Sequence, residues 1–196
     1  MLRVAIVLAV VLALLIVATT TRSGVTWRLI TFTYQVNLLA AVFYLGALVS
    51  PRIDSRAAWR GAAVVYLVVA GLVWNLFLTG YSMGYTPANF LLHVVVPVLA
   101  VVEWLIATRD HVRDHDPIRW WHPLLWLIYP AAYVAVALLV LNHAGRRVPY
   151  YFLDPGTVGT ATVATNIAVL GLIFLGLGYL VVAVGRTSSR RRVGPG

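Results

Sequence analysis

Six long apolar runs, separated by short polar segments, constrain the fold of this chain more than any other feature of its sequence. A helix needs about 20 apolar residues to cross the hydrocarbon core of a bilayer. A membrane β-barrel would instead show roughly ten-residue segments of alternating hydrophobicity. We therefore expect an all-α polytopic membrane protein with six transmembrane helices, at Leu2–Thr20, Leu29–Val49, Gly61–Thr79, Ala88–Ala107, Pro123–Leu141 and Val158–Gly185.

The composition of the 196 residues agrees with this class of protein. They are 61% hydrophobic and 11% charged, whereas soluble domains are about 25% charged and disordered chains have low hydrophobicity. The lack of cysteine excludes disulfides, thiol catalysis and cysteine-ligated zinc. Because no soluble domain fits between the spans, we expect residues 1–186 to form one transmembrane domain and residues 187–196 to form a basic, disordered cytoplasmic tail.

The arginines predict how the chain is oriented in the membrane. All 15 basic residues are arginines, and the net charge is +9. Eleven of them fall on the side that holds both termini, and four fall on the opposite side. The positive-inside rule then places both termini in the cytoplasm of a multi-pass protein of the plasma membrane. The arginines lie beside the spans, where lipid head groups are, so we expect membrane lipids as partners and no nucleic acid.

The first apolar run has two interpretations. A charged start followed by an apolar stretch is also typical of a secretory signal peptide. The stretch Val4–Ala18 is long for that role, however, and Ala18–Thr21 offers no clear cleavage site. We expect an uncleaved first helix.

Several polar side chains lie within the apolar runs, where the bilayer penalises any polar group that lacks a partner. In the expected topology, four of them come from four spans and reach a similar depth below the outer face. They are Thr31, Asn75, His93 and Asn166. Asn89 shares a helix face with His93, and Pro97 frees the His93 carbonyl from its helical hydrogen bond. This pattern predicts a polar pocket in the outer half, although residues such as Asn37 are also suited to holding helices together.

Three further features also have two interpretations each. Glu103, near the cytoplasmic end of its span, either reaches water or pairs with an arginine. His111 and His115 have the spacing of metal ligands if their segment is helical, but the alternating charges around them favour a solvated loop, and we expect no metal or cofactor. The segment Pro149–Pro155 is either a lid over the outer pocket or an interfacial segment in which Asp154 caps the sixth span.

Short motifs in spans two to six resemble one protein family. Trp27–Phe32 is similar to the Trp-Lys-Tyr-Leu-Thr-Phe stretch of the family of androgen-induced protein and androgen-dependent TFPI-regulating protein, and Asn89–His93 resembles its Asn-His-x-x-His. A bacterial branch of six-helix membrane proteins looks closer still. Its Phe-Thr-x-Gln-Ser-Asn, Leu-Leu-His-x-x-x-Pro, Tyr-Pro-x-x-Tyr and Tyr-x-Phe-Leu-Asp motifs resemble Phe32–Asn37, Leu91–Pro97, Tyr129–Tyr133 and Tyr151–Asp154.

The resemblance implies a threonine hydrolase that cleaves lipid esters, namely fatty acid esters of hydroxy fatty acids. It places the nucleophile at Thr31 and its base at His93. The threonine of the bacterial motif falls instead on Thr33, the alternative nucleophile. Because residues two apart point to nearly opposite helix faces, only one threonine can meet His93. The polar pocket, including donors to an oxyanion, is expected from Gln35, Asn37, Asn75, Asn89, Asn166 and Asp154.

Two other functions remain open at this point. One is a non-catalytic lipid-binding or scaffold membrane protein, in which the polar residues only hold helices together. The other is a small-molecule or proton transporter that uses His93 and Glu103. No internal repeat of the kind found in many transporters is visible in the sequence.

Overall fold

The computed structural model describes residues 1–20, 25, 28–80, 86–109, 118–141 and 149–190. Within this described part of the chain, all regular elements are helical. The helices are α1 (Leu2–Thr20), η1 (Arg28–Ile30), α2 (Phe32–Val49), α3 (Pro51–Asp54), α4 (Ala57–Val73), η2 (Trp74–Leu78), α5 (Pro87–Phe90), η3 (Leu91–Val95), α6 (Val96–Arg109), α7 (His122–Trp126), α8 (Ile128–Val136), η5 (Ala137–Leu141), η6 (Tyr151–Leu153), α9 (Pro155–Val158) and α10 (Thr160–Arg190).

Among the described residues, six helical segments are long and apolar enough to cross a bilayer, which agrees with the predicted number of spans and indicates a multi-pass membrane protein. They run over Leu2–Thr20, Phe32–Val49, Ala57–Leu78, Pro87–Thr108, His122–Leu141 and Thr160–Arg186. The second begins three residues later than predicted because Arg28–Ile30 form a separate 3₁₀ turn. The last helix continues to Arg190, so the disordered tail predicted from residue 187 is wrong for residues 187–190, and residues 191–196 lie outside the described part.

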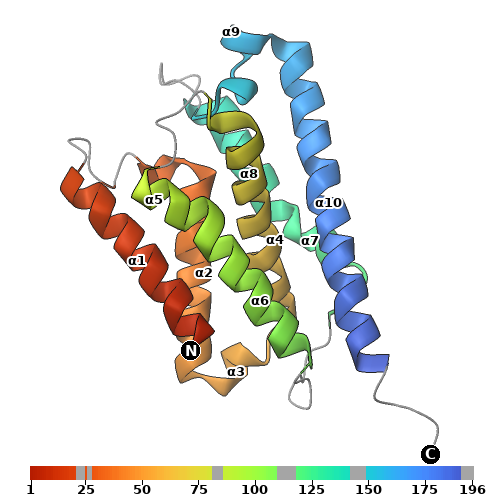
Figure 1. Cartoon of the computed structure of the whole chain (residues 1–196). Coiled ribbons are helices and arrows are strands. Elements are labelled where there is room, and N and C mark those ends of the chain that lie inside the picture. The colour runs from red at the N-terminus through yellow and green to blue at the C-terminus, as the bar shows by residue number, and fades with distance from the viewer. Residues whose placement is uncertain (21–24, 26–27, 81–85, 110–117, 142–148, 191–196) are drawn as a thin grey trace, which may run out of the picture.

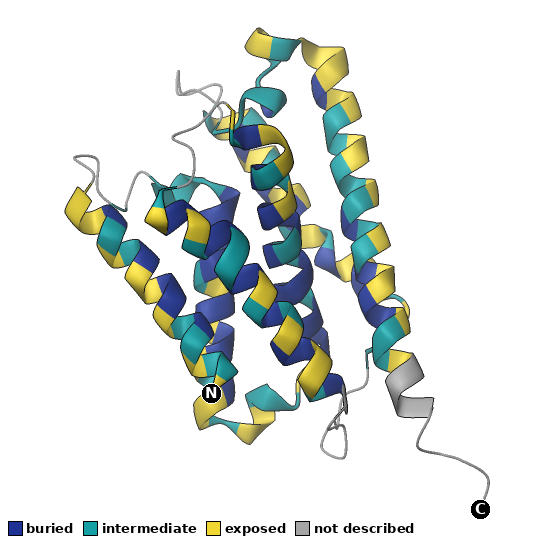
Figure 2. Ribbon diagram, viewed as in Figure 1, coloured by how far each residue is buried: buried dark blue, intermediate teal, exposed yellow. Residues whose placement is uncertain are grey.

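Large apolar side chains on the outer surface of the bundle agree with a lipid environment. Soluble proteins rarely expose extensive apolar surface, yet exposed positions follow the length of α1 and α10 (Figure 2). Leu8, Leu12 and Leu15 are exposed on α1, and Leu172 and Leu180 on α10. The outer surface of these helices is therefore apolar and suited to contact with acyl chains.

The helix formed by α4 and η2 lies at the centre of the bundle (Figure 1) and is its most buried span. It packs against α2, α6 and α10. On the flanks, α1 packs against α2 and α6, and α10 packs against α4 and α7. We call the end that holds the start of α1 and α3 the α3 end, and the end that holds η1, α5 and α9 the α9 end (Figure 1).

Aromatic rings join four of the spans in the core. Phe32 of α2 lies with its ring centroid 5.3 Å from that of Tyr133 and 5.8 Å from that of Tyr129, both on α8. Tyr66 of α4 and Phe174 of α10 complete the cluster, each within 6.3 Å of Phe32. Edge-on and tilted contacts of this kind stabilise a core beyond the area that they bury.

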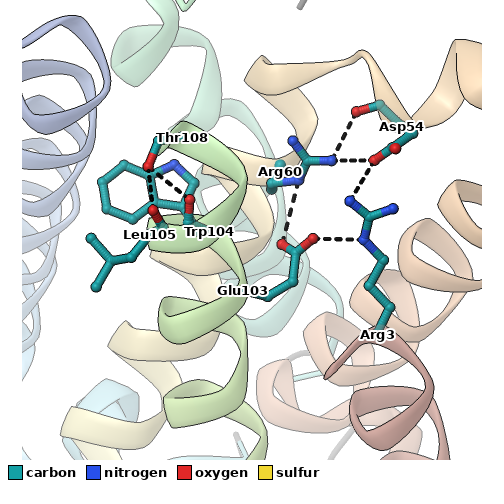
Figure 3. Close-up of polar contacts among 7 residues, drawn as sticks. All are labelled: Arg3, Asp54, Arg60, Glu103, Trp104, Leu105 and Thr108. Atoms are coloured by element: carbon teal, nitrogen blue, oxygen red, sulfur yellow. Dashed lines mark hydrogen bonds and ion pairs between the residues drawn. The ribbon is translucent and has the colours of Figure 1, made fainter. Parts of the chain in front are cut away.

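A compact cluster of four charged residues joins four helices at the α3 end (Figure 3). Arg3 of α1 contacts both carboxylates, with Nε 2.7 Å from Glu103 Oε1 and a terminal nitrogen 2.7 Å from Asp54 Oδ1. Arg60 of α4 pairs with Asp54 of α3, and its Nε lies 3.4 Å from Glu103 Oε2 of α6. The cluster has two positive and two negative groups. Of the two alternatives for Glu103, pairing with arginine is therefore correct, since the residue is buried.

Removing one charge from this cluster should cost more stability than removing a pair. We expect Glu103→Gln to lower the free energy of unfolding by about 3 kcal/mol, because Arg3 and Arg60 would share one remaining carboxylate. The double variant Arg60→Met with Glu103→Leu leaves only the Arg3–Asp54 pair and should lose markedly less. Unfolding by denaturing detergent in mixed micelles measures both. A double variant that loses as much stability as Glu103→Gln, or more, would contradict this account of the cluster.

Candidate functional site

A threonine and a histidine from different helices meet near the α9 end. Thr33 comes from the first turn of α2, and His93 comes from the π-helical turn η3. The Thr33 Oγ1 atom lies 3.3 Å from His93 Nε2. Both residues are buried, with 6% and 4% of their surface exposed. A hydroxyl and an imidazole in hydrogen-bonding contact can act as nucleophile and base.

The second imidazole nitrogen fixes which tautomer His93 adopts. His93 Nδ1 lies 2.9 Å from the carbonyl oxygen of Asn89, four residues earlier on the same face. A carbonyl can only accept a hydrogen bond, so Nδ1 must hold the proton. In the neutral ring, Nε2 then presents its lone pair to Thr33, whose hydroxyl donates to it. This is the arrangement that a general base requires before the reaction begins.

The central helix forms the wall behind His93. The indole of Trp74 is stacked on the imidazole, with a centroid distance of 4.2 Å and an angle of 22° between the planes. A Cβ atom added to Gly71 would lie 2.7 Å from the His93 carbonyl oxygen, so glycine is what allows α4 to approach this closely. Asn75 Nδ2 donates to the Gly71 carbonyl at 2.7 Å and to the His93 carbonyl at 3.4 Å. The carbonyl that Pro97 was predicted to free thus has a donor from another helix.

Thr31 does not pair with His93, which corrects the preferred prediction for the nucleophile. It lies just before α2 and is half-buried, and its hydroxyl donates to the Arg28 carbonyl at 2.8 Å. Thr33, the alternative, occupies the position at His93. The physical reason is that Thr31 precedes α2 in an extended conformation and bonds the 3₁₀ turn before it, whereas Thr33 is carried by the helix itself.

The amides predicted on α2 serve the backbone near the site. Gln35 donates to the Leu29 carbonyl at 2.8 Å and accepts from the Tyr129 hydroxyl at 2.7 Å. Asn37 is buried and donates to the carbonyls of Thr33 and Leu92. Gln35 therefore fixes the backbone that precedes α2. Asn37 joins α2 to η3, which is the role of holding helices together that was considered for it.

The polar residues predicted from the other spans hold loops and turns. Asn89 is buried and supplies the carbonyl that accepts from His93. Asn166 of α10 donates to the Phe152 carbonyl at 2.8 Å. Asp154 accepts from the Gly156 amide and from the Thr157 hydroxyl, so it caps the short helix α9 rather than the sixth span. It does not orient His93, whose Nδ1 is bound by a carbonyl.

An apolar pocket with a cavity volume of about 50 Å³ lies beside Thr33. Thr33 is part of its wall, whereas His93, which contacts the Thr33 hydroxyl, is not. The segment between α8 and α9 contributes three lining residues, as the lid alternative predicts. The wall consists of Phe32, Thr33, Val69, Ala70, Val73, Leu78, Pro130, Tyr133, Val134, Tyr150, Phe152, Leu153, Leu170 and Phe174.

Tyr150 is a site residue that was not predicted as one. Its hydroxyl oxygen accepts a hydrogen bond from the Thr33 amide at 3.4 Å. Burial raises the pKa of this phenol, so the hydroxyl keeps its proton at neutral pH. The only signal in the sequence was its place in the segment considered as a lid, where it was otherwise indistinguishable from an interfacial tyrosine.

His111 and His115, which have the spacing of metal ligands, lie outside the described residues. Among the residues that are described, no three metal-ligating side chains gather.

Comparison with family models, with curated proteins and with solved structures found no match to this chain. The family resemblance therefore stays a prediction, and the site is interpreted from its geometry.

Gly71→Ala should disturb the site through the backbone of His93. The new methyl group would lie 2.7 Å from the His93 carbonyl oxygen, and we expect a loss of about 1–3 kcal/mol from overpacking. Gly171→Ala is a matched control, because no atom lies within 4 Å of its added Cβ, and the exchange favours a helix. Thermal unfolding in detergent compares the two. Equal stability of both variants would show that the close approach of α4 is not required.

Proposed function

We propose that this protein is a membrane-embedded hydrolase of lipid esters, with Thr33 as its nucleophile and His93 as its general base. The observation that supports this most directly is the 3.3 Å contact between Thr33 Oγ1 and the unprotonated Nε2 of His93. The Asn89 carbonyl, 2.9 Å from Nδ1, keeps the ring in the tautomer that can accept the threonine proton.

The chemistry follows from these two groups and water. His93 Nε2 accepts the hydroxyl proton as Thr33 Oγ1 attacks the ester carbonyl carbon. The tetrahedral intermediate collapses, the carbon–oxygen bond to the alcohol breaks, and the imidazolium returns the proton to the leaving oxygen. Water then attacks the acyl-threonine while Nε2 accepts one of its protons, and that proton restores the Thr33 hydroxyl as the free acid leaves.

The substrate class is inferred from the pocket and from the bilayer around it. The pocket beside Thr33 has an almost entirely apolar wall, which suits an acyl chain better than a polar acyl donor. Lipid reaches such a site sideways from the membrane. The resemblance to the androgen-induced protein family, and to its bacterial branch, makes fatty acid esters of hydroxy fatty acids the first substrates to test.

The orientation is part of the same proposal. Arg3 and Arg60 belong to the charged cluster at the α3 end (Figure 3), α3 itself holds Arg52, and the last turns of α10, at the same end (Figure 1), hold Arg186. Arg28 belongs to η1, at the α9 end. The positive-inside rule then favours a cytoplasmic α3 end and cytoplasmic termini. In a plasma membrane, Thr33 and His93 would act in the outer half of the bilayer.

A non-catalytic lipid-binding or scaffold protein is the second candidate. It is favoured by the amides Gln35, Asn37 and Asn166, all of which hydrogen-bond backbone groups. In this case the apolar pocket would hold an acyl chain without cleaving it. A transporter that links His93 with Glu103 has no comparable support, because Glu103 is paired with Arg3 and Arg60 at the α3 end.

Two isosteric substitutions separate these candidates. We expect a fluorophosphonate probe to label the wild-type protein in membranes and to label Thr31→Val equally, because the Thr31 hydroxyl donates to the Arg28 carbonyl and not to His93. Thr33→Val, which removes the one hydroxyl at Nε2, should abolish labelling and ester hydrolysis. His93→Gln should slow both by about 10²–10⁴-fold. Mass spectrometry of the labelled peptide identifies the modified residue.

The outcomes of this experiment discriminate between the functions. Labelling that survives in Thr33→Val would overturn the assignment of the nucleophile. Folded wild-type protein that is neither labelled nor able to hydrolyse long-chain esters would favour the lipid-binding candidate. Thr33→Ser provides a further control, because it retains a hydroxyl and should retain labelling.

A further inference from the structure

We infer that the hydroxyl of Tyr150 donates a hydrogen bond to the oxyanion that forms when Thr33 attacks an ester. This inference rests on the proposed function and adds a third catalytic residue to it. Acyl transfer places a negative charge on the former carbonyl oxygen, and a fixed donor at that point stabilises the transition state more than the substrate. Of the residues expected in the polar pocket, five have side chains that bond other groups, as described above, whereas Tyr150 lines the pocket beside Thr33. The five are Gln35, Asn37, Asn75, Asn166 and Asp154.

The start of α2 explains why a tyrosine hydroxyl lies here. The first amides of a helix lack acceptors within the helix, and a threonine in the position of Thr31 commonly supplies one. The Thr31 side chain makes no such cap here and donates to the Arg28 carbonyl instead. The amide of Thr33 donates to the Tyr150 oxygen at 3.4 Å. That oxygen acts as an acceptor for the helix and retains its own proton for donation.

The base and the phenol contact different groups of Thr33, namely its side-chain hydroxyl and its backbone amide. His93 contacts the Thr33 side chain but is not part of the pocket wall, whereas Tyr150 is. An ester carbonyl must enter from the pocket to be attacked by Oγ1. Its oxygen would then lie on the side of Thr33 that Tyr150 occupies, near the positive end of the α2 dipole. The proton moves toward His93, while the negative charge develops toward Tyr150.

The neighbours of Tyr150 hold its ring in place. Phe152 stacks on it with a centroid distance of 5.4 Å and an angle of 17° between the rings. Tyr133 of α8 lies 6.3 Å away on another side. The segment is anchored by Leu153, which is 2% exposed, and by the hydrogen bond from Asn166 to the Phe152 carbonyl. A donor fixed in this way needs little rearrangement during the reaction. The raised pKa of the phenol also keeps it in the protonated, donating form.

The test compares two adjacent tyrosines in the full-length protein. We expect Tyr150→Phe to lower kcat for hydrolysis of p-nitrophenyl octanoate in mixed micelles by about 10²–10³-fold, which is the usual effect of losing one oxyanion donor. KM should change less than about 3-fold, because the ring and the pocket wall are retained. Tyr151→Phe is the matched control, since Tyr151 belongs to the same segment but does not line the pocket, and its kcat should equal that of the wild type.

A second set of variants separates catalysis from folding. Fluorotyrosines incorporated at position 150 retain the shape of the ring and its hydroxyl but differ in the acidity of the phenol. If the hydroxyl donates to the oxyanion, kcat should vary with that acidity across the series. A constant kcat in the series, or an unchanged kcat in folded Tyr150→Phe, overturns this inference alone. A wild-type protein without Thr33-dependent hydrolysis overturns the proposed function and this inference with it.

Discussion

Polar groups inside this bundle have no water to bond, and that constraint accounts for the placement of its helices. In hydrocarbon, a polar group that lacks a partner costs several kcal/mol. At the α3 end, two arginines and two carboxylates from four helices pair with one another. Near the α9 end, one carbonyl orients the imidazole of His93, which in turn accepts from Thr33. Both arrangements form only when helices that are far apart in the sequence pack in a fixed position along one another.

The central helix links these two arrangements. Arg60 near the start of α4 belongs to the charged cluster, and Trp74 at the start of η2 stacks on His93. Between them, Gly71 permits a backbone contact with η3 that any side chain would prevent. Because α4 contacts α2, α6 and α10 at the same time, it fixes where the nucleophile, the base and the pocket lie relative to one another. The same helix therefore contributes to stability at one end and to the geometry of the site at the other.

Hydrophobicity was enough to predict six spans, because helix length and apolar content are local properties of the chain. The depth of the polar residues predicted a pocket shared by the second and fourth spans, and the family resemblance implied that a threonine of the second span meets His93. The choice between Thr31 and Thr33 depended on the rotation of α2 about its axis, which begins after an unpredicted 3₁₀ turn at Arg28–Ile30. Tyr150 was missed because its contact with Thr33 spans 117 residues, and no local pattern encodes such a contact.

The pairing of Arg3 with Glu103 has a consequence for biosynthesis. A growing chain inserts α1 before α6, whose Glu103 is one of the two carboxylates that pair with Arg3 and lies 100 residues after it. Until the fourth span is inserted, Asp54 and lipid head groups must neutralise Arg3 without Glu103. The first span can pack on α2 early, but its contact with α6 forms only then, so closure of the bundle around α1 is a late event in assembly.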